Sequence, residues 1–85
     1  MNPGSWTSVE LPSDARLLRK ETFTLQMEQQ DYDIELFETM EGEYYAMGTP
    51  RAGDKIIVYG SPVVPDAALA LQIVIDKIQR EQVKE

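Results

Sequence analysis

The sequence predicts an α+β fold, in which a four-stranded antiparallel sheet (β-β-β-β-α) carries one long C-terminal helix packed on one face. Apolar and polar residues alternate in short runs through the middle of the chain, which is typical of half-buried strands. After residue 60 the apolar residues recur every three or four positions, which indicates an amphipathic helix. With 85 residues the chain is long enough for one domain and not two.

The alternating runs predict four strands, at residues 22–28, 32–39, 44–47 and 55–59. In the first run, Phe23, Leu25 and Met27 point to one side and the polar residues to the other. The last run has apolar residues on both faces, so we expect a central or covered strand there. The connections are short, which favours pairing of strands in chain order.

Residues 65–82 are expected to form the helix, with Pro65 in its first turn and Asp66 at its positive end. At 100° per residue, one apolar stripe centred on Leu71 would face the sheet. Its members are Ala67, Ala68, Leu71, Val74, Ile75 and Ile78. Leu69 and Ile73 lie one turn apart on the opposite side of the helix.

Three explanations of this outer pair stay open. The N-terminal tail (residues 1–12, irregular because of its Pro, Gly and Ser residues) would cover it through Trp6, Val9 or Leu11. Alternatively, the pair belongs to an interface with a partner or a second copy, or it is simply exposed.

The single α+β domain would span residues 13–85, beginning with either a short helix capped by Ser13 or an extended run into the first strand.

The charge of the chain is strongly acidic and unevenly distributed. The net charge is −7 and the pI is about 4.4. This balance disfavours a nucleic-acid or anionic-membrane partner and favours a basic protein. Residues 28–43 contain seven acidic residues and no Lys or Arg. This window is either a solvated sheet face or a docking surface for a basic protein.

Several kinds of chemistry lack the residues they need. The chain has no Cys and no His, which removes disulfides, thiolate and imidazole metal ligands and the usual catalytic triads. The run Asp31–Glu35 has acids at alternate positions but lacks the Gly of a calcium loop, and Arg51 fits a charged loop tip better than an anion site. We therefore expect no enzyme, cofactor or metal, and a cytoplasmic location since no apolar run resembles a secretory or membrane segment.

Three short motifs lie between residues 22 and 80, namely Gly42-Glu43-Tyr44-Tyr45-Ala46, Val58-Tyr59-Gly60 and Asp66-Ala67-Ala68-Leu69. They resemble motifs of HicB-like antitoxin domains, and the chain also looks like other small bacterial proteins. The resemblance applies to the fold, and it implies a domain that covers a basic toxin protein. The chain departs from the family in the turn at Gly48-Thr49-Pro50 and in the longer, proline-containing segment before the helix.

The sequence thus predicts a small, non-catalytic protein-interaction domain that binds a basic protein or associates with itself. An accessory subunit of a larger enzyme assembly is the alternative. The expected partner-binding residues are Asp31, Asp33, Glu35, Glu38, Glu41, Glu43, Leu69 and Ile73. An exposed first strand would also be able to accept a strand from a partner.

Overall fold

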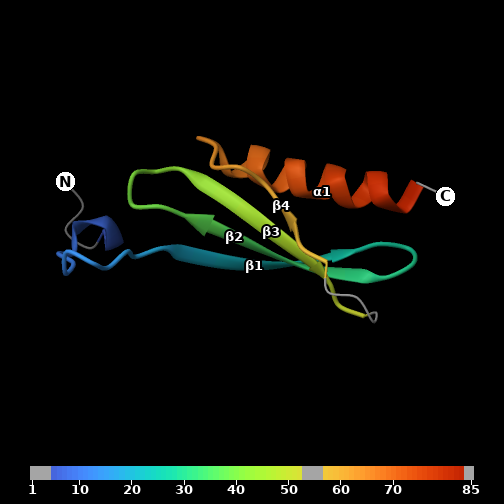
Figure 1. The fold of residues 1–85 in the computed structure, drawn as a ribbon, viewed down its shortest axis with the longest axis horizontal. Coiled ribbons are helices and arrows are strands. Elements are labelled where there is room, and N and C mark those ends of the chain that lie inside the picture. The colour runs from blue at the N-terminus through green and yellow to red at the C-terminus, as the bar shows by residue number, and fades with distance from the viewer. Residues whose placement is uncertain (1–4, 53–56, 84–85) are drawn as a thin grey trace.

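The alternating runs fold as a meander whose strands pair in chain order, and the helix lies across one face (Figure 1). The structure is a computed structural model that describes residues 5–52 and 57–83. Its elements are a 3-10 helix η1 (Trp6–Ser8), strands β1 (Arg19–Gln26), β2 (Asp31–Glu38), β3 (Tyr44–Pro50) and β4 (Tyr59–Gly60), and helix α1 (Ala67–Val83). The predicted α+β fold, an antiparallel four-stranded sheet with a C-terminal helix, is confirmed.

The period-two pattern of β2 decides which face of the sheet meets the helix. Tyr32, Ile34 and Leu36 are buried beneath α1, whereas the residues between them point to the uncovered outer face. The register continues these faces into the neighbouring strands, because Ile34 stands opposite Phe23 of β1 and Gly48 of β3. We call the two sides of the sheet the helix face and the outer face.

The core is small and lies between β2, β3 and α1. Its buried hydrophobic residues are Tyr32, Ile34, Leu36, Ala46, Ala70, Val74 and Ile78. Gly48 allows the closest approach of α1, because a Cβ atom there would lie 2.9 Å from Cγ1 of Val74. The sheet and the helix therefore meet where the strand presents no side chain.

Helix α1 begins later and is turned differently from the prediction. Asp66 precedes its first residue and accepts a hydrogen bond from the backbone N of Leu69 at 3.1 Å, so it is the N-cap and Pro65 lies outside the helix. The buried stripe includes Ala70, whereas Ala68, which was expected to face the sheet, is exposed. The predicted centre at Leu71 was wrong by part of a turn, because Leu71 is only half-buried at one side of the stripe.

Three strand predictions also differ from the structure. The first strand, predicted at residues 22–28, is β1 and runs from Arg19 to Gln26. The predicted strand at residues 55–59 was expected to be central or covered, but β4 is a two-residue edge strand and Ile57 and Val58 before it are exposed. Residues 55 and 56 lie outside the described residues. Strand β3 continues to Pro50 instead of ending at Met47, and no helix forms at residues 13–18.

The helix covers only part of the sheet. Within the described residues, α1 packs over β2, β3 and β4, and its backbone does not approach β1, which lies at the far edge in Figure 1. The molecule is elongated, with extents of 50 × 23 × 19 Å and a radius of gyration of 15.3 Å. A compact domain of this length would have a radius of about 12 Å. The difference reflects a long hairpin and tail that extend beyond the small core.

Candidate interaction surfaces

The eight residues predicted to bind a partner lie in three separate places. Asp31, Asp33, Glu35 and Glu38 are on β2, Glu41 and Glu43 are in the β2–β3 turn, and Leu69 and Ile73 are on α1. On β2, the first three acids are on the outer face, and Glu38, two residues beyond Leu36, is on the helix face. The predicted acidic surface is therefore divided between two faces and a turn.

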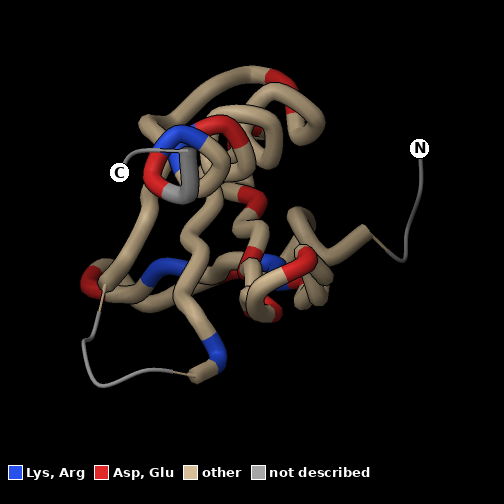
Figure 2. The backbone as a smooth tube through the Cα atoms, turned by 90° about the vertical axis from the view of Figure 1, so that its right-hand side faces the viewer, with Lys and Arg blue, Asp and Glu red and all other residues tan. Residues whose placement is uncertain are grey.

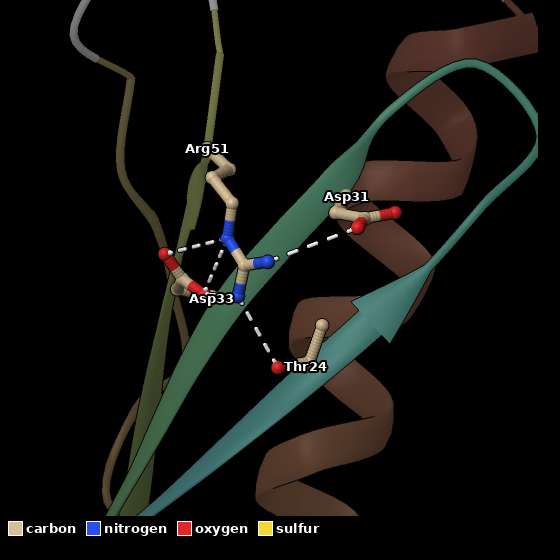
Figure 3. Close-up of polar contacts among 4 residues, drawn as sticks. All are labelled: Thr24, Asp31, Asp33 and Arg51. Carbon is tan, nitrogen blue, oxygen red and sulfur yellow. Dashed lines mark hydrogen bonds and ion pairs between the residues drawn. The ribbon is translucent and has the colours of Figure 1, made fainter.

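Arg51 lies directly beside the acids of β2 on the outer face (Figure 3). Its guanidinium donates from Nε and Nη2 to the carboxylate of Asp33, with Nε 3.2 Å from Oδ1, and its Nη1 lies 3.8 Å from Oδ2 of Asp31. Nη2 also donates to Oγ1 of Thr24 on β1, at 3.3 Å. The hydrogen bonds from Arg51 hold the pKa of the Asp33 carboxyl below its ordinary value. Arg51, predicted to be a charged loop tip, lies directly after β3 and its side chain links that strand to β2 and β1.

The other two acids of β2 also have basic neighbours within the chain. Nζ of Lys20 lies 3.3 Å from Oε2 of Glu35 on the outer face. Nη1 of Arg19 lies 3.9 Å from Oε1 of Glu38 on the helix face, where Tyr44 also donates from its hydroxyl to Oε2 at 3.4 Å. In Figure 2 the basic segments lie among the acidic ones along the sheet. The four acids of the strand are thus largely compensated locally, although the linear sequence places their cations outside the acidic window.

The acids of the β2–β3 turn are arranged differently. Glu41 and Glu43 are exposed, and neither has an ion pair among the described residues. The turn itself is held by Thr39, which is buried: its backbone N donates to the carbonyl of Glu43 at 2.8 Å and its hydroxyl accepts from the backbone N of Glu43 at 3.1 Å. These two carboxylates are the part of the acidic window that is presented on a fixed turn without an ion pair among the described residues.

The outer helix pair is only partly exposed. The side chain of Leu69 is 45% exposed, whereas Ile73 is half-buried. The described part of the tail does not cover this pair, because η1 makes no backbone contact with α1 and the apolar tail residues Val9 and Leu11 are themselves exposed. Residues 11 and 15–18 instead line a small hollow against Thr39, Met40 and Glu41 of that turn. Of the three explanations, an interface and simple exposure remain.

Strand β1 carries an exposed surface that the hydrophobic pattern did not indicate. Phe23 points to the helix face, as its alternation predicts, yet it is 39% exposed because α1 does not extend over β1. The strand is also at the edge of the sheet, so one side of its backbone has no neighbouring strand among the described residues. Sequence periodicity shows which face a residue is on, but the width of the sheet that one helix covers depends on where the helix docks.

No described helix or strand covers the outer face of the sheet, and its side chains are mixed in character. Phe37 and Tyr45 stack on it, with ring centroids 4.8 Å apart and planes 12° from parallel. Beside them, Met47 and Val58 contribute apolar atoms to a shallow hollow that also contacts Thr22, Thr49 and two acids. No group of three or more acidic side chains within the described residues is placed to hold a metal ion. No described helix has the length and apolarity needed to cross a membrane.

Comparisons with known proteins do not add a relative. No protein-family model matches the chain, and no curated protein or solved structure matches it either.

Proposed function

We propose that this chain is a non-catalytic protein-interaction domain that acts in the cytoplasm and binds a partner chain by strand addition to β1. The observation that supports the proposal most is the incomplete cover of the sheet: β1 has an unpaired edge, and Phe23 beside that edge is exposed on the face where the core lies. A partner strand would pair with the backbone of β1 and place apolar side chains against Phe23.

The two edge strands of the sheet, β1 and β4, differ in how well they are protected against pairing with a strand from another chain. Edges are usually kept from pairing by shortness, proline, bulges, charged side chains or a covering segment. Strand β4 has only two residues and leads into Ser61-Pro62, whereas β1 has eight residues, no proline and an uninterrupted register with β2. The charges of β1 (Arg19, Lys20 and Glu21) lie in its first half, so its second half is the less protected edge, next to the exposed Phe23.

The hydrogen-bond pattern of β1 allows a direct test. In an antiparallel pair, alternate residues direct both backbone groups toward the same neighbour. Met27 donates to the carbonyl of Gln30 across the β1–β2 turn, so the alternation places the backbone groups of Phe23 toward β2 and those of Thr22 toward the free edge. Thr22→Pro thus removes one outward donor without removing a hydrogen bond to β2, and proline is tolerated in an edge strand at such a position. Thr22→Ala, which keeps the N–H group, is the matched control.

The test is affinity capture from the lysate of the source cells at low salt, with the unaltered chain, Thr22→Ala and Thr22→Pro as baits. The first two baits should retain the same stoichiometric partner and the third should lose it, while circular dichroism shows the same fold for all three. Retention of every partner by Thr22→Pro would disprove strand addition. A partner that arrives as a complete multi-subunit enzyme would favour the alternative role as an accessory subunit.

A second candidate is a basic protein partner, as the resemblance to HicB-like domains implies. The observations that favour it are the net charge of −7 and the two turn acids, Glu41 and Glu43, which form no ion pair among the described residues. Binding at this turn would weaken with salt and with the variant Glu41→Gln/Glu43→Gln, whereas Thr22→Pro would leave it unchanged. The three baits and a salt series therefore separate the two candidates.

A further inference from the structure

We propose that the strand that pairs with β1 is β1 of a second copy of this chain, giving a two-fold symmetric dimer with one continuous eight-stranded sheet. This inference rests on the proposed function, since it uses the same edge and names its occupant. The symmetry axis passes beside Phe23, perpendicular to the sheet, and both α1 helices lie on the same face.

The backbone of β1 restricts how two copies pair. Lys20, Thr22, Thr24 and Gln26 direct their backbone groups to the free edge, so these even-numbered residues must meet even-numbered residues of the second copy. The antiparallel register centred on Phe23 meets this requirement. It pairs Thr22 of each copy with Thr24 of the other and Lys20 with Gln26, which uses all but one residue of the strand.

The side chains support the same register. Phe23 would stand opposite its own copy at a position without backbone hydrogen bonds, where side chains are closest and aromatic pairs are favourable. Each Phe23 is now 39% exposed at the edge, so the second ring would cover part of its exposed surface. The Thr22–Thr24 pairs on the outer face would combine two residues that favour strands.

When two copies of β1 run antiparallel, the end of one strand lies beside the opposite end of the other, and the charges of these two ends differ in sign. The N-terminal end carries Arg16, Arg19 and Lys20 with one acid, Glu21, and the C-terminal end continues into the turn that carries Glu28. Antiparallel pairing places the mainly basic end of each copy beside the acidic turn of the other, twice in the dimer. Charges more than about 8 Å apart are screened at physiological ionic strength, so the distant acids of the two chains repel each other only weakly.

The first test is the mass in solution, measured by sedimentation equilibrium over a series of protein concentrations. The unaltered chain and Thr22→Ala should pass from monomer to dimer, while Thr22→Pro should remain monomeric at every concentration. If the unaltered chain and both variants are monomeric, the proposal of a second copy is wrong. Strand addition by another protein would then still be decided by the capture experiment. A dimer that persists in Thr22→Pro would also overturn it, because the dimer would then use another surface such as Leu69.

A charge-exchange experiment keeps the proposal testable even where Thr22→Pro fails to fold. Lys20→Glu and Glu28→Arg should each dimerise more weakly than the unaltered chain, since Lys20 of one copy and Glu28 of the other lie diagonally on the outer face and each change brings like charges together at both contacts. An equimolar mixture of the two should recover a dimer, because each contact then joins opposite charges. A mixture that stays as weak as its components would contradict the antiparallel arrangement.

The register can be tested by cross-linking, because the chain contains no cysteine. Phe23→Cys should form a disulfide-linked dimer under mild oxidation, since the two Cβ atoms on the axis would be about 4.5–5.5 Å apart. Gln72→Cys, on an exposed position of α1, is the control and should remain monomeric on reducing-agent-free gels. Equal cross-linking of both variants, or of neither, would contradict the register centred on Phe23.

Discussion

The close approach of α1 to β3 at Gly48 predicts a large effect of a single methyl group. A Cβ atom at this position would lie 2.9 Å from Cγ1 of Val74 and 3.3 Å from Cδ1 of Ile78. Carbon atoms in contact are normally about 3.5–4.0 Å apart, so Gly48→Ala would force the helix or these side chains to move by roughly half an ångström. Both neighbours are fully buried, so they have no free space in which to move.

The expected loss of stability is the difference between two effects. Overpacking a core typically costs about 1–3 kcal/mol. The reduced freedom of the unfolded chain when Ala replaces Gly offsets about 0.4–1 kcal/mol of this. We therefore expect Gly48→Ala to lower the free energy of unfolding by about 1–2 kcal/mol, which for a domain of this size lowers Tm by about 4–16 °C.

Thermal and urea unfolding followed by circular dichroism measure this loss, with Gly60→Ala as the control. A Cβ atom at Gly60 would meet nothing nearer than the carbonyl oxygen of Ala46 at 3.9 Å, so its stability should change by less than about 0.5 kcal/mol. Val74→Ala removes the atom that clashes, so the double variant should be more stable than the sum of the two single losses by at least about 0.5 kcal/mol. Strict additivity, or a Gly48→Ala protein as stable as the unaltered chain, would refute the proposed contact.

Three further outcomes follow from the helix cap, the β2–β3 turn and the ion pair on the outer face. Asp66→Ala should cost about 1 kcal/mol in urea unfolding because it leaves the N–H of Leu69 without its side-chain acceptor, while Asp66→Ser should retain most of the stability. Gly42→Ala should lower stability by about 1–2 kcal/mol in the same measurement, because Gly42 has a φ of 85°. Gly42→Asn should lower it less, since Asn tolerates a positive φ better than Ala. Equal losses of stability in the two variants would mean that φ is not the cause. Folding lowers the pKa of Asp33, because its carboxylate pairs with Arg51. The pairing therefore stabilises the folded protein fully at pH values above the unfolded-state pKa of about 3.9. This stabilisation is lost as the pH falls through the folded-state pKa, which is lower. Arg51→Gln should therefore reduce the difference in stability between neutral pH and the acid range, and an unchanged difference would show that the pair does not contribute.

The fold could be predicted from the sequence because the alternation within each strand and the pairing of neighbouring strands favour the same sheet. Strict alternation from Asp31 to Leu36 leaves only one face of β2 apolar, and strands joined by short turns pair in chain order. The fourth strand was predicted too long because Ile57 and Val58 are apolar, whereas the structure leaves both exposed before β4. Hydrophobicity does not by itself determine whether a segment finds a partner in the sheet.

The candidate site was less accessible to sequence reasoning, for two physical reasons. The acids of β2 form an uninterrupted acidic window along the chain, but pairing in the sheet brings Lys20 and Arg51 from other strands beside Glu35 and Asp33. The exposure of Phe23 depends on the docking position of α1, which is determined by close packing at Gly48. Both properties arise from contacts between segments distant in the chain, and a one-dimensional pattern does not contain them.

The separation of α1 from β1 has a consequence for the motions of the sheet. Since the helix backbone does not approach β1, this strand is held to the rest of the molecule by its ladder with β2, by Leu25, which packs against the core, and by the hydrogen bond from Arg51 to Thr24. Local opening that peels β1 away would expose little of the core residues on β3 and α1. Amide hydrogen exchange should accordingly form a gradient across the sheet, fastest in β1 and slowest in β3, and a monomer would spend part of its time as a three-stranded sheet under an intact helix.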